Sequence, residues 1–262
     1  MDKTINEWNP GKYLEFKNER TQPSIDLVER IDLKDPKTII DIGCGPGNST
    51  QILVNKYPNS YIVGLDSSIN MIEKAQNDYP NQNWIHGYAE KLNDDKKYSL
   101  VFSNAALQWI NNHEILIPNL WKIVDENGAF AAQIPSFARM PINTVINNII
   151  KKTQWNKKLI KRSWEEELND LNSYYELLSK YTNKIFLWET HYFHIMQSMK
   201  GIVDFIDSTA LKPYMEQLST EKDRNIFEDE ILDECYKYYK VQSNGNVLFP
   251  FIRMFMIAYK HE

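Results

Sequence analysis

A short apolar run that ends in an acid and a glycine-rich loop constrains the fold of this chain more than any other feature. The run KTIIDIG, residues 37–43, is rich in β-branched residues and closes at a glycine, as a buried strand does. A helical pattern, NSTQILVNKYP at residues 48–58, follows it, with Asn48 or Ser49 as the expected N-cap. This order of strand, glycine turn and helix is typical of an α/β domain with a parallel sheet.

The same alternation runs through the first half of the chain. Further strands are expected over residues 60–66, 83–90, 98–106 and 129–135. Further helices are expected over residues 67–79, with Ser67 or Ser68 as the N-cap, and over residues 113–128, stopped by Gly128. Strands that alternate with helices predict an α/β fold with a doubly wound, mostly parallel sheet.

The second half of the chain is richer in helical patterns. Residues 139–180 and 198–241 are expected to be mostly helical. Two apolar, aromatic-rich runs, residues 184–196 and 247–260, are expected to add a sixth and a seventh strand. The predicted sheet therefore has seven strands.

The position of the insertions indicates where a ligand binds. Ligands of open α/β sheets bind beyond the carboxyl ends of the parallel strands, and residues 139–180 leave the sheet at that end. We therefore predict a single domain over residues 1–262, in which insertions 139–180 and 198–241 form a helical cap over the cleft. Residues 1–21 precede the first helix and are expected to form a lid segment.

Composition argues against several classes of protein. The net charge of −5 gives no global attraction to nucleic acid or to an anionic membrane. No run reaches the ~18 apolar residues that would span a bilayer, and the first ten residues lack the apolar core of a secretory signal. The two cysteines, Cys44 and Cys235, are too few for a disulfide framework or a zinc site. We expect a cytoplasmic protein without a metal, a monomer or a weak homodimer.

The glycine loop, GCGPG at residues 43–47, lacks features of two common phosphate-binding loops. A P-loop has a lysine and a hydroxyl residue after its last glycine, but Asn48 and Ser49 follow here. A dinucleotide-binding loop reads G-x-G-x-x-G, and Asn48 stands in place of its third glycine. The loop therefore favours neither of these ligands.

Two acids near the loop suggest a different ligand. Asp41, two residues before Gly43, would repel a diphosphate and suits a cation such as the ammonium of a methionine moiety. Asp66 ends the second expected strand, ~20 residues after the loop, where an acid can accept both hydroxyls of a ribose. An ammonium and a ribose in one ligand indicate S-adenosylmethionine.

These motifs carry a family resemblance. DIGCGPGNST, residues 41–50, and GLDSS, residues 64–68, resemble the first two motifs of the class I S-adenosylmethionine-dependent methyltransferases. A closer resemblance, over nearly the whole chain, is to the trans-aconitate methyltransferases, and it is carried by WNPGKYLEFKNERTQP, SNAALQW, NSYYELLSK, WETHYFHIM and FPFIRMF. The resemblance implies a Rossmann-like fold and methyl transfer to a carboxylate of a small polycarboxylic acid, with trans-aconitate the leading candidate and a monomethyl ester the product.

The resemblance also implies a set of cofactor contacts. The positions that match the family's cofactor motif are Asp41, Gly43, Gly45, Asp66, Ala89 and Asn104. Further expected cofactor contacts are Arg20, Asn48, Ser67, Met71, Glu90 and Ala105. The sequence departs from the superfamily pattern GDAE, because GYAEKL has Tyr88 in the place of the acid. The adenine contact is then expected from Glu90 or from the backbone amide of Ala89.

The expected reaction needs positioning rather than a general base, because a carboxylate is already ionised at neutral pH. Arg253 is the best candidate to bind the substrate, since it lies in an apolar run and a buried guanidinium needs an anion. An ion pair with an acid of the fold is the alternative role. Trp109, after strand four, and Tyr192 complete the expected catalytic set, and the other expected substrate contacts are Tyr13, Tyr175, Tyr192, His194 and Lys212. Each of these could instead be packing or surface.

Two other functions remain open on the sequence. One is a methyltransferase for another small molecule, such as a carrier-bound acid or an amine, for which Arg253 would have no ligand role. The other is a protein that binds S-adenosylmethionine without catalysis, because an intact glycine loop argues for binding alone.

Overall fold

The structure, a computed structural model, describes residues 17–93, 95–160 and 170–260. These residues divide into two compact units. The first comprises residues 17–93, 95–135, 170–190 and 253–260, and the second comprises residues 136–160 and 191–252. Along the sequence, the second unit is therefore made of two insertions into the first.

Seven strands in the described part of the chain form one sheet, in the order β3-β2-β1-β4-β5-β7-β6. They are β1 (Thr38–Ile42), β2 (Tyr61–Asp66), β3 (Asn83–His86), β4 (Tyr98–Asn104), β5 (Val124–Pro135), β6 (Ile185–Met196) and β7 (Val247–Tyr259). The neighbours from β3 to β5 are parallel, and β7 is antiparallel to β5. The predicted doubly wound, mostly parallel seven-stranded sheet is confirmed.

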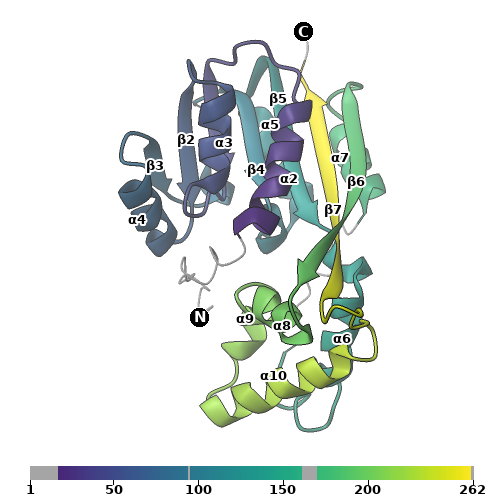
Figure 1. Ribbon diagram of the computed structural model, residues 1–262. Helices are drawn as coiled ribbons and strands as arrows, with labels where there is room; N and C mark the ends of the chain where they lie inside the picture. The colour runs from purple at the N-terminus through teal and green to yellow at the C-terminus, as the bar shows by residue number, and fades with distance from the viewer. Residues whose placement is uncertain (1–16, 94, 161–169, 261–262) are drawn as a thin grey trace. The chain divides into compact units, whose positions relative to one another are not determined.

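Helices cover both faces of the sheet in the first unit (Figure 1). They are α2 (Lys17–Arg30), α3 (Asn48–Lys56), α4 (Ile69–Asp78), α5 (His113–Lys122) and α7 (Leu171–Leu178). On one face, Ile40 and Ile42 of β1 share an apolar cluster with Leu116 of α5 and Leu177 of α7. On the other, the Asp41 side chain accepts hydrogen bonds from α3, because successive side chains of a strand point to opposite faces.

Helix α4 has a side-chain N-cap, whereas α3 has a glycine N-cap. Ser68 caps α4 by accepting a hydrogen bond from the Met71 amide at 3.4 Å, as one of the two expected residues. The expected cap of α3 by Asn48 or Ser49 is wrong, because the N-cap is Gly47, with φ 94°, which has no side chain to cap the helix. The Ser49 hydroxyl donates to Asp41 instead.

The helix expected over residues 113–128 is also shorter than predicted. It ends at Lys122, and β5 begins at Val124 rather than at residue 129, because Val124 pairs with Tyr98 of β4. Asn127 has φ 60°, which allows the irregular register between the two strands. The apolar period of this stretch could not distinguish a last helical turn from a strand that starts early.

The third strand is shorter than residues 83–90, because β3 ends at His86 and a short 3-10 helix, η1 (Ala89–Lys91), follows. Helix α2, which follows the expected lid segment, starts earlier than expected. It begins at Lys17, so residues 17–21 of the expected lid segment are helical. Residues 1–16, which include the expected contact Tyr13, lie outside the described residues.

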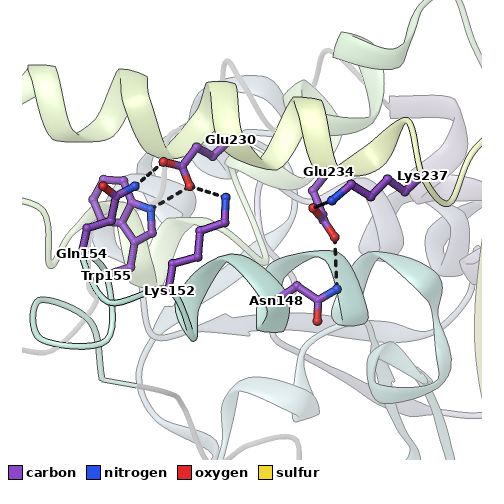
Figure 2. A network of polar contacts seen from close by, with 7 residues as sticks. All are labelled: Asn148, Lys152, Gln154, Trp155, Glu230, Glu234 and Lys237. Carbon is purple, nitrogen blue, oxygen red and sulfur yellow. Dashed lines mark hydrogen bonds and ion pairs between the residues drawn. The ribbon is translucent and has the colours of Figure 1, made fainter.

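The second unit is mainly helical. Its helices are η3 (Phe137–Arg139), α6 (Pro141–Ile150), α8 (Met199–Asp207), α9 (Lys212–Met215) and α10 (Glu221–Cys235). Two groups of polar contacts join α10 to α6 and the turn after it (Figure 2). Glu230 accepts from Lys152 Nζ at 2.8 Å, from Trp155 Nε1 at 3.1 Å and from Gln154.

The second of these groups surrounds Glu234. Its carboxylate accepts from Asn148 Nδ2 at 3.1 Å and from Lys237 Nζ at 2.6 Å, and the pKa of Glu234 is lowered, chiefly by the hydrogen bond from Lys237 (Figure 2). Two carboxylates on consecutive turns of α10 thus fasten this helix to the segment that starts with α6.

The expected helical insertions, residues 139–180 and 198–241, fall mostly in the second unit, whereas α7 belongs to the first. The function of these insertions as a cap on a single domain stays a prediction. Among the described helices, none has the length and apolar character needed to cross a membrane.

Candidate cofactor and substrate site

The polar residues of the first unit gather at the carboxyl ends of four neighbouring strands. Asp66 ends β2, Asp41 lies next to the last residue of β1, and Asn104 ends β4. Gln133 of β5 is in register with Asn104. This edge is where ligands of open parallel sheets bind.

The glycine loop connects three of these strand ends. The amides of Gly43 and Cys44 donate to the Leu65 carbonyl of β2 at 2.7 and 3.1 Å. Gly43 has φ +69°, and a Cβ at this position would lie 2.1 Å from the Cβ of Ala106, which follows β4. Only glycine fits this position, since it combines a left-handed backbone with close contact to the next loop.

Asp41 is a fully buried acid, with 0% of its surface exposed. Its Oδ2 accepts hydrogen bonds from the Ser49 and Thr50 hydroxyls, both at 2.6 Å. Burial raises the pKa of Asp41 to about 6, although the two hydroxyls act to lower it, and the charge of Asp66 adds to the rise. Its Oδ1 has no hydrogen-bond partner among the described residues, so this carboxylate holds one unused acceptor.

Asp66 organises the backbone around it. Its Oδ2 accepts from the Gly45 amide at 2.8 Å, and its Oδ1 accepts from the Ser68 amide at 2.8 Å. Burial raises the pKa of Asp66, and the backbone hydrogen bonds partly offset that rise. Asp66 remains partly exposed, so its carboxylate can also accept hydrogen bonds from ligand hydroxyls.

The other expected cofactor residues lie around these acids in varied settings. Met71 and Ala89 are buried, Ser67 is half-buried, and Glu90 is exposed on η1. Arg20 is buried in the first turn of α2. Their contacts with a cofactor stay predictions.

Two expected residues at the end of β4 have unusual features. The Oδ1 of Asn104 is buried and has no partner in the described part of the chain. Ala105 has φ 54°, a left-handed conformation that is rare for a residue with a side chain, and its amide donates to the Gln133 carbonyl at 3.0 Å. Strain of this kind is often found at functional sites. Asn48, at the start of α3, likewise has a buried Nδ2 without a partner among the described residues.

Arg253 is 3% exposed, as the sequence predicted for a residue in an apolar run. Its Nη1 donates to Gln133 Oε1 at 3.2 Å. Gln133 is therefore a candidate that sequence reasoning missed. The only signal was a single polar residue within the buried run AFAAQIP, which on its own predicts nothing specific.

Two further candidates belong to the first unit. Trp109 is half-buried in the 3-10 helix η2 (Leu107–Trp109), directly after the loop that follows β4. Tyr175 is 50% exposed on α7, whereas its neighbour Tyr174 is buried and contacts His113 Nδ1 at 2.7 Å. The role of Tyr175 in substrate binding stays a prediction. Of these two tyrosines, Tyr174 is the buried one.

Three candidates belong to the second unit. Tyr192 and His194 stack with ring centroids 6.3 Å apart, and His194 is buried beside Phe205 and Phe251 at 5.3 and 5.6 Å. The Lys212 Nζ lies 3.2 Å from the Glu216 carboxylate. The structure brings Tyr192 and His194 together, and their contacts with a substrate stay predictions.

The residues of the first unit fit S-adenosylmethionine. Its ammonium needs acceptors, and the buried Oδ1 atoms of Asp41 and Asn104 are acceptors without partners among the described residues. Its ribose needs a further acceptor, which Asp66 provides at the end of the next strand. In the same part of the chain, no group of three or more His, Cys, Asp or Glu residues could hold a metal ion.

Comparison with known proteins agrees with this chemistry. Residues 39–128 match the model of a methyltransferase domain family. A protein of Escherichia coli O139:H28 (strain E24377A / ETEC) named trans-aconitate 2-methyltransferase is 32% identical over 258 residues, which are 98% of this chain and 100% of that protein. A protein of the same name from Enterobacter sp. (strain 638) is 32% identical over 96% of this chain and 98% of its own length.

Solved structures share the fold. A putative methyltransferase from Bacillus halodurans C-125 superposes with a TM-score of 0.60 at 17% identity, over 92% of this chain and 100% of its own. We conclude that this chain belongs to the trans-aconitate methyltransferase family and is a methyltransferase with S-adenosylmethionine as its methyl donor.

Proposed function

We propose that this methyltransferase esterifies one carboxylate of a small polycarboxylic acid, with trans-aconitate as the leading substrate. The observation that carries the proposal is the similarity, over nearly the full length of both chains, to proteins named trans-aconitate 2-methyltransferase. The buried guanidinium of Arg253 supports it, because a guanidinium at the carboxyl end of the sheet is the side chain best suited to bind a carboxylate through paired donors.

The polar residues at the carboxyl ends of β1, β2 and β4 are assigned to the cofactor. Asp41 Oδ1 and Asn104 Oδ1 would accept hydrogen bonds from the ammonium group of S-adenosylmethionine, and the Asp66 carboxylate would accept them from its ribose hydroxyls. Bound S-adenosylmethionine would supply an electrophilic methyl group. The buried Met71 and Ala89 are assigned to the adenine side of the same site, which leaves the exposed Glu90 for a contact at its edge.

The chain's part in the reaction is positioning. A substrate carboxylate is ionised at neutral pH, so no residue has to remove a proton from it. Arg253 is assigned to bind a carboxylate of the acid and fix its position, and Trp109, in η2 after β4, is assigned as a further residue of the reaction site. Orientation of two reactants in this way can provide a large part of a rate enhancement.

The roles of Tyr192, His194 and Lys212 as further substrate contacts, and of the helical insertions as a cap that excludes water, stay predictions. The lid segment 1–21, the monomeric or weakly dimeric state, the cytoplasmic location and the absence of nucleic-acid or membrane partners stay predictions.

The test is turnover of a panel of acids by the purified protein with S-adenosylmethionine. The panel contains trans-aconitate and other small di- and tricarboxylic acids, and the measured products are S-adenosylhomocysteine and methyl esters, by mass spectrometry. Trimethyl trans-aconitate, which has no free carboxylate, is the matched control. We expect turnover of at least one acid and none of the control. Turnover of amines or carrier-bound acids alone would overturn the proposal.

A further inference from the structure

Gln133 and Arg253 form a buried polar pair at the carboxyl end of β5. In the antiparallel pairing of β5 with β7, Gln133 is in register with Phe255 and Pro135 with Arg253. Residues two apart on a strand share a face, so Arg253 and Gln133 lie on the same face of the sheet. The Arg253 Nη1 donates to Gln133 Oε1 at 3.2 Å.

The chemistry of the guanidinium fixes the orientation of the Gln133 amide. A guanidinium has no acceptor, so the amide oxygen has to face Arg253 and the amide nitrogen has to point away from it. That nitrogen, Nε2, belongs to a residue with 0% exposure and has no hydrogen-bond partner among the described residues. A buried NH2 group of this kind requires an acceptor that the described chain does not supply.

The neighbouring strands β1 and β4 carry buried hydrogen-bond acceptors instead of donors. Asn104 is in register with Gln133. Its Oδ1 is buried, and so is Asp41 Oδ1 on β1, and neither atom has a hydrogen-bond partner in the described part of the chain. Among the described residues, acceptors without partners therefore lie on β1 and β4, whereas the unpartnered Nε2 donor of Gln133 lies on β5, next to the Arg253 guanidinium of β7. A cation is favoured on the first pair of strands and an anion on the second.

We propose that Gln133 is a substrate-binding residue, whose Nε2 donates a hydrogen bond to the same carboxylate that the Arg253 guanidinium binds. This inference rests on the proposed function, since it assigns the anion to the polycarboxylate substrate. It adds a specificity determinant: a neutral amide beside a guanidinium selects a carboxylate, because a ligand without an acceptor leaves Nε2 unsatisfied.

Two variants and one control test the proposal. Gln133→Met removes both polar atoms at similar size, and Gln133→Glu keeps an acceptor for Arg253 but replaces the donor with a negative charge. Ser103→Ala is the control, because the Ser103 hydroxyl makes one buried hydrogen bond to the Ile42 carbonyl at 2.9 Å and lies on the opposite face of β4 from Asn104. Thermal melting checks that each variant is folded.

The measurements are KM and kcat for trans-aconitate, its Kd for the protein loaded with S-adenosylhomocysteine, and the Kd of S-adenosylhomocysteine alone. We expect Gln133→Met to raise the KM and Kd of the acid about tenfold or more, Gln133→Glu to raise them further, and Ser103→Ala to leave both unchanged. The affinity for S-adenosylhomocysteine should be the same in all of them. If Gln133→Met does not fold, Gln133→Glu decides.

Three results would overturn the inference. An acid Kd within twofold of the wild type in both variants would leave Gln133 without a role in substrate binding. A loss of affinity for S-adenosylhomocysteine would assign Nε2 to the cofactor. If trans-aconitate does not bind the wild type, the proposed function fails separately, and succinate, citrate and sulfate are titrated as anion probes. Binding of one of them to the wild type but not to Gln133→Met supports the anion site, and binding of none overturns it.

Discussion

Asp41→Asn should separate two effects of the buried Asp41 carboxylate, its effect on the unfolding free energy and its effect on cofactor affinity. The pKa of Asp41 is raised from an ordinary value of 3.8 to about 6, mainly by burial. The folded state therefore holds this proton more tightly than the unfolded chain, and stability contributed by protonated Asp41 is lost as the pH rises from about 4 through about 6. The difference corresponds to on the order of 3 kcal/mol of unfolding free energy at pH 7.

The replacement is matched to the structure. An asparagine oxygen can still accept both hydroxyl hydrogen bonds from Ser49 and Thr50, while no charge is left to bury. The assay is urea unfolding of the cofactor-free protein at pH 5 and at pH 8. At pH 5 part of this stability is already lost, so we expect the wild type to lose about 1.4 kcal/mol more than Asp41→Asn between these two pH values, which is roughly 3–6 °C in Tm.

The same variant should bind the cofactor less well. The asparagine NH2 takes the place of Oδ1, so a donor meets the ammonium and a charge-assisted hydrogen bond is lost. We expect the Kd of S-adenosylhomocysteine to rise roughly 10- to 100-fold at pH 7.5, and that of methylthioadenosine, which lacks the amino acid moiety, to stay constant. Parallel pH curves for the two proteins would refute the raised pKa, and an unchanged Kd for S-adenosylhomocysteine would refute the contact with the ammonium.

Two further substitutions test the loop and the second unit. Gly43→Ala places a Cβ 2.1 Å from that of Ala106 at φ +69°, so we expect on the order of 2–4 kcal/mol lower stability in urea unfolding, and an unchanged unfolding midpoint would contradict the geometry. Glu230→Ala removes the acceptor shared by Lys152 and Trp155, so we expect the unfolding free energy of the second unit to fall by about 1–2 kcal/mol, measured by fluorescence. The affinity for S-adenosylhomocysteine should be retained, and a loss of that affinity would contradict the assignment of the cofactor to the first unit.

The backbone of the first unit was largely predictable from the sequence. The β-branched runs that form β1, β2 and β4 are closed by polar or glycine residues, so their periods and ends are both readable. The prediction failed where the local pattern was ambiguous and pairing decided. Val124 continues the apolar pattern of α5, but its pairing with Tyr98 draws it into β5. No local rule contains that partner.

The side chains of the site were predictable by type but not by contact. The sequence predicts that Asp41 faces a ligand. It does not show that Ser49 and Thr50 occupy one of its oxygens and that the other has no partner within the described ranges. Gln133 was missed because its importance depends on a guanidinium 120 residues away in the chain. Whether a buried polar atom lacks a hydrogen-bond partner depends on residues distant in sequence, so the sequence does not reveal it. The proposed ligand positions are defined by such atoms among the described residues.

The separation of acceptors and donors along this edge should couple the two ligands. Neighbouring strands are about 4.8 Å apart, so Asp41 on β1 and Gln133 on β5, with β4 between them, are about 10 Å apart across the sheet. At an effective dielectric constant of about 20, two unit charges at that distance interact by about 1–2 kcal/mol. Without cofactor, an ionised Asp41 therefore repels a substrate carboxylate bound at Gln133, and the ammonium of the cofactor cancels this repulsion.

We accordingly expect the wild type at pH 7.5 to bind trans-aconitate roughly 5- to 20-fold more tightly when loaded with S-adenosylhomocysteine than when free. Asp41→Asn lacks the repelling charge, so its cofactor-free form should already bind the acid more tightly than the cofactor-free wild type. Isothermal titration of both proteins, with and without saturating S-adenosylhomocysteine, measures all four affinities. Equal affinities of the free and loaded wild type would show that the charge of Asp41 is not felt at the anion site. Any dependence of substrate affinity on bound cofactor would then need direct contacts between the two ligands, because the electric field of Asp41 could not produce it.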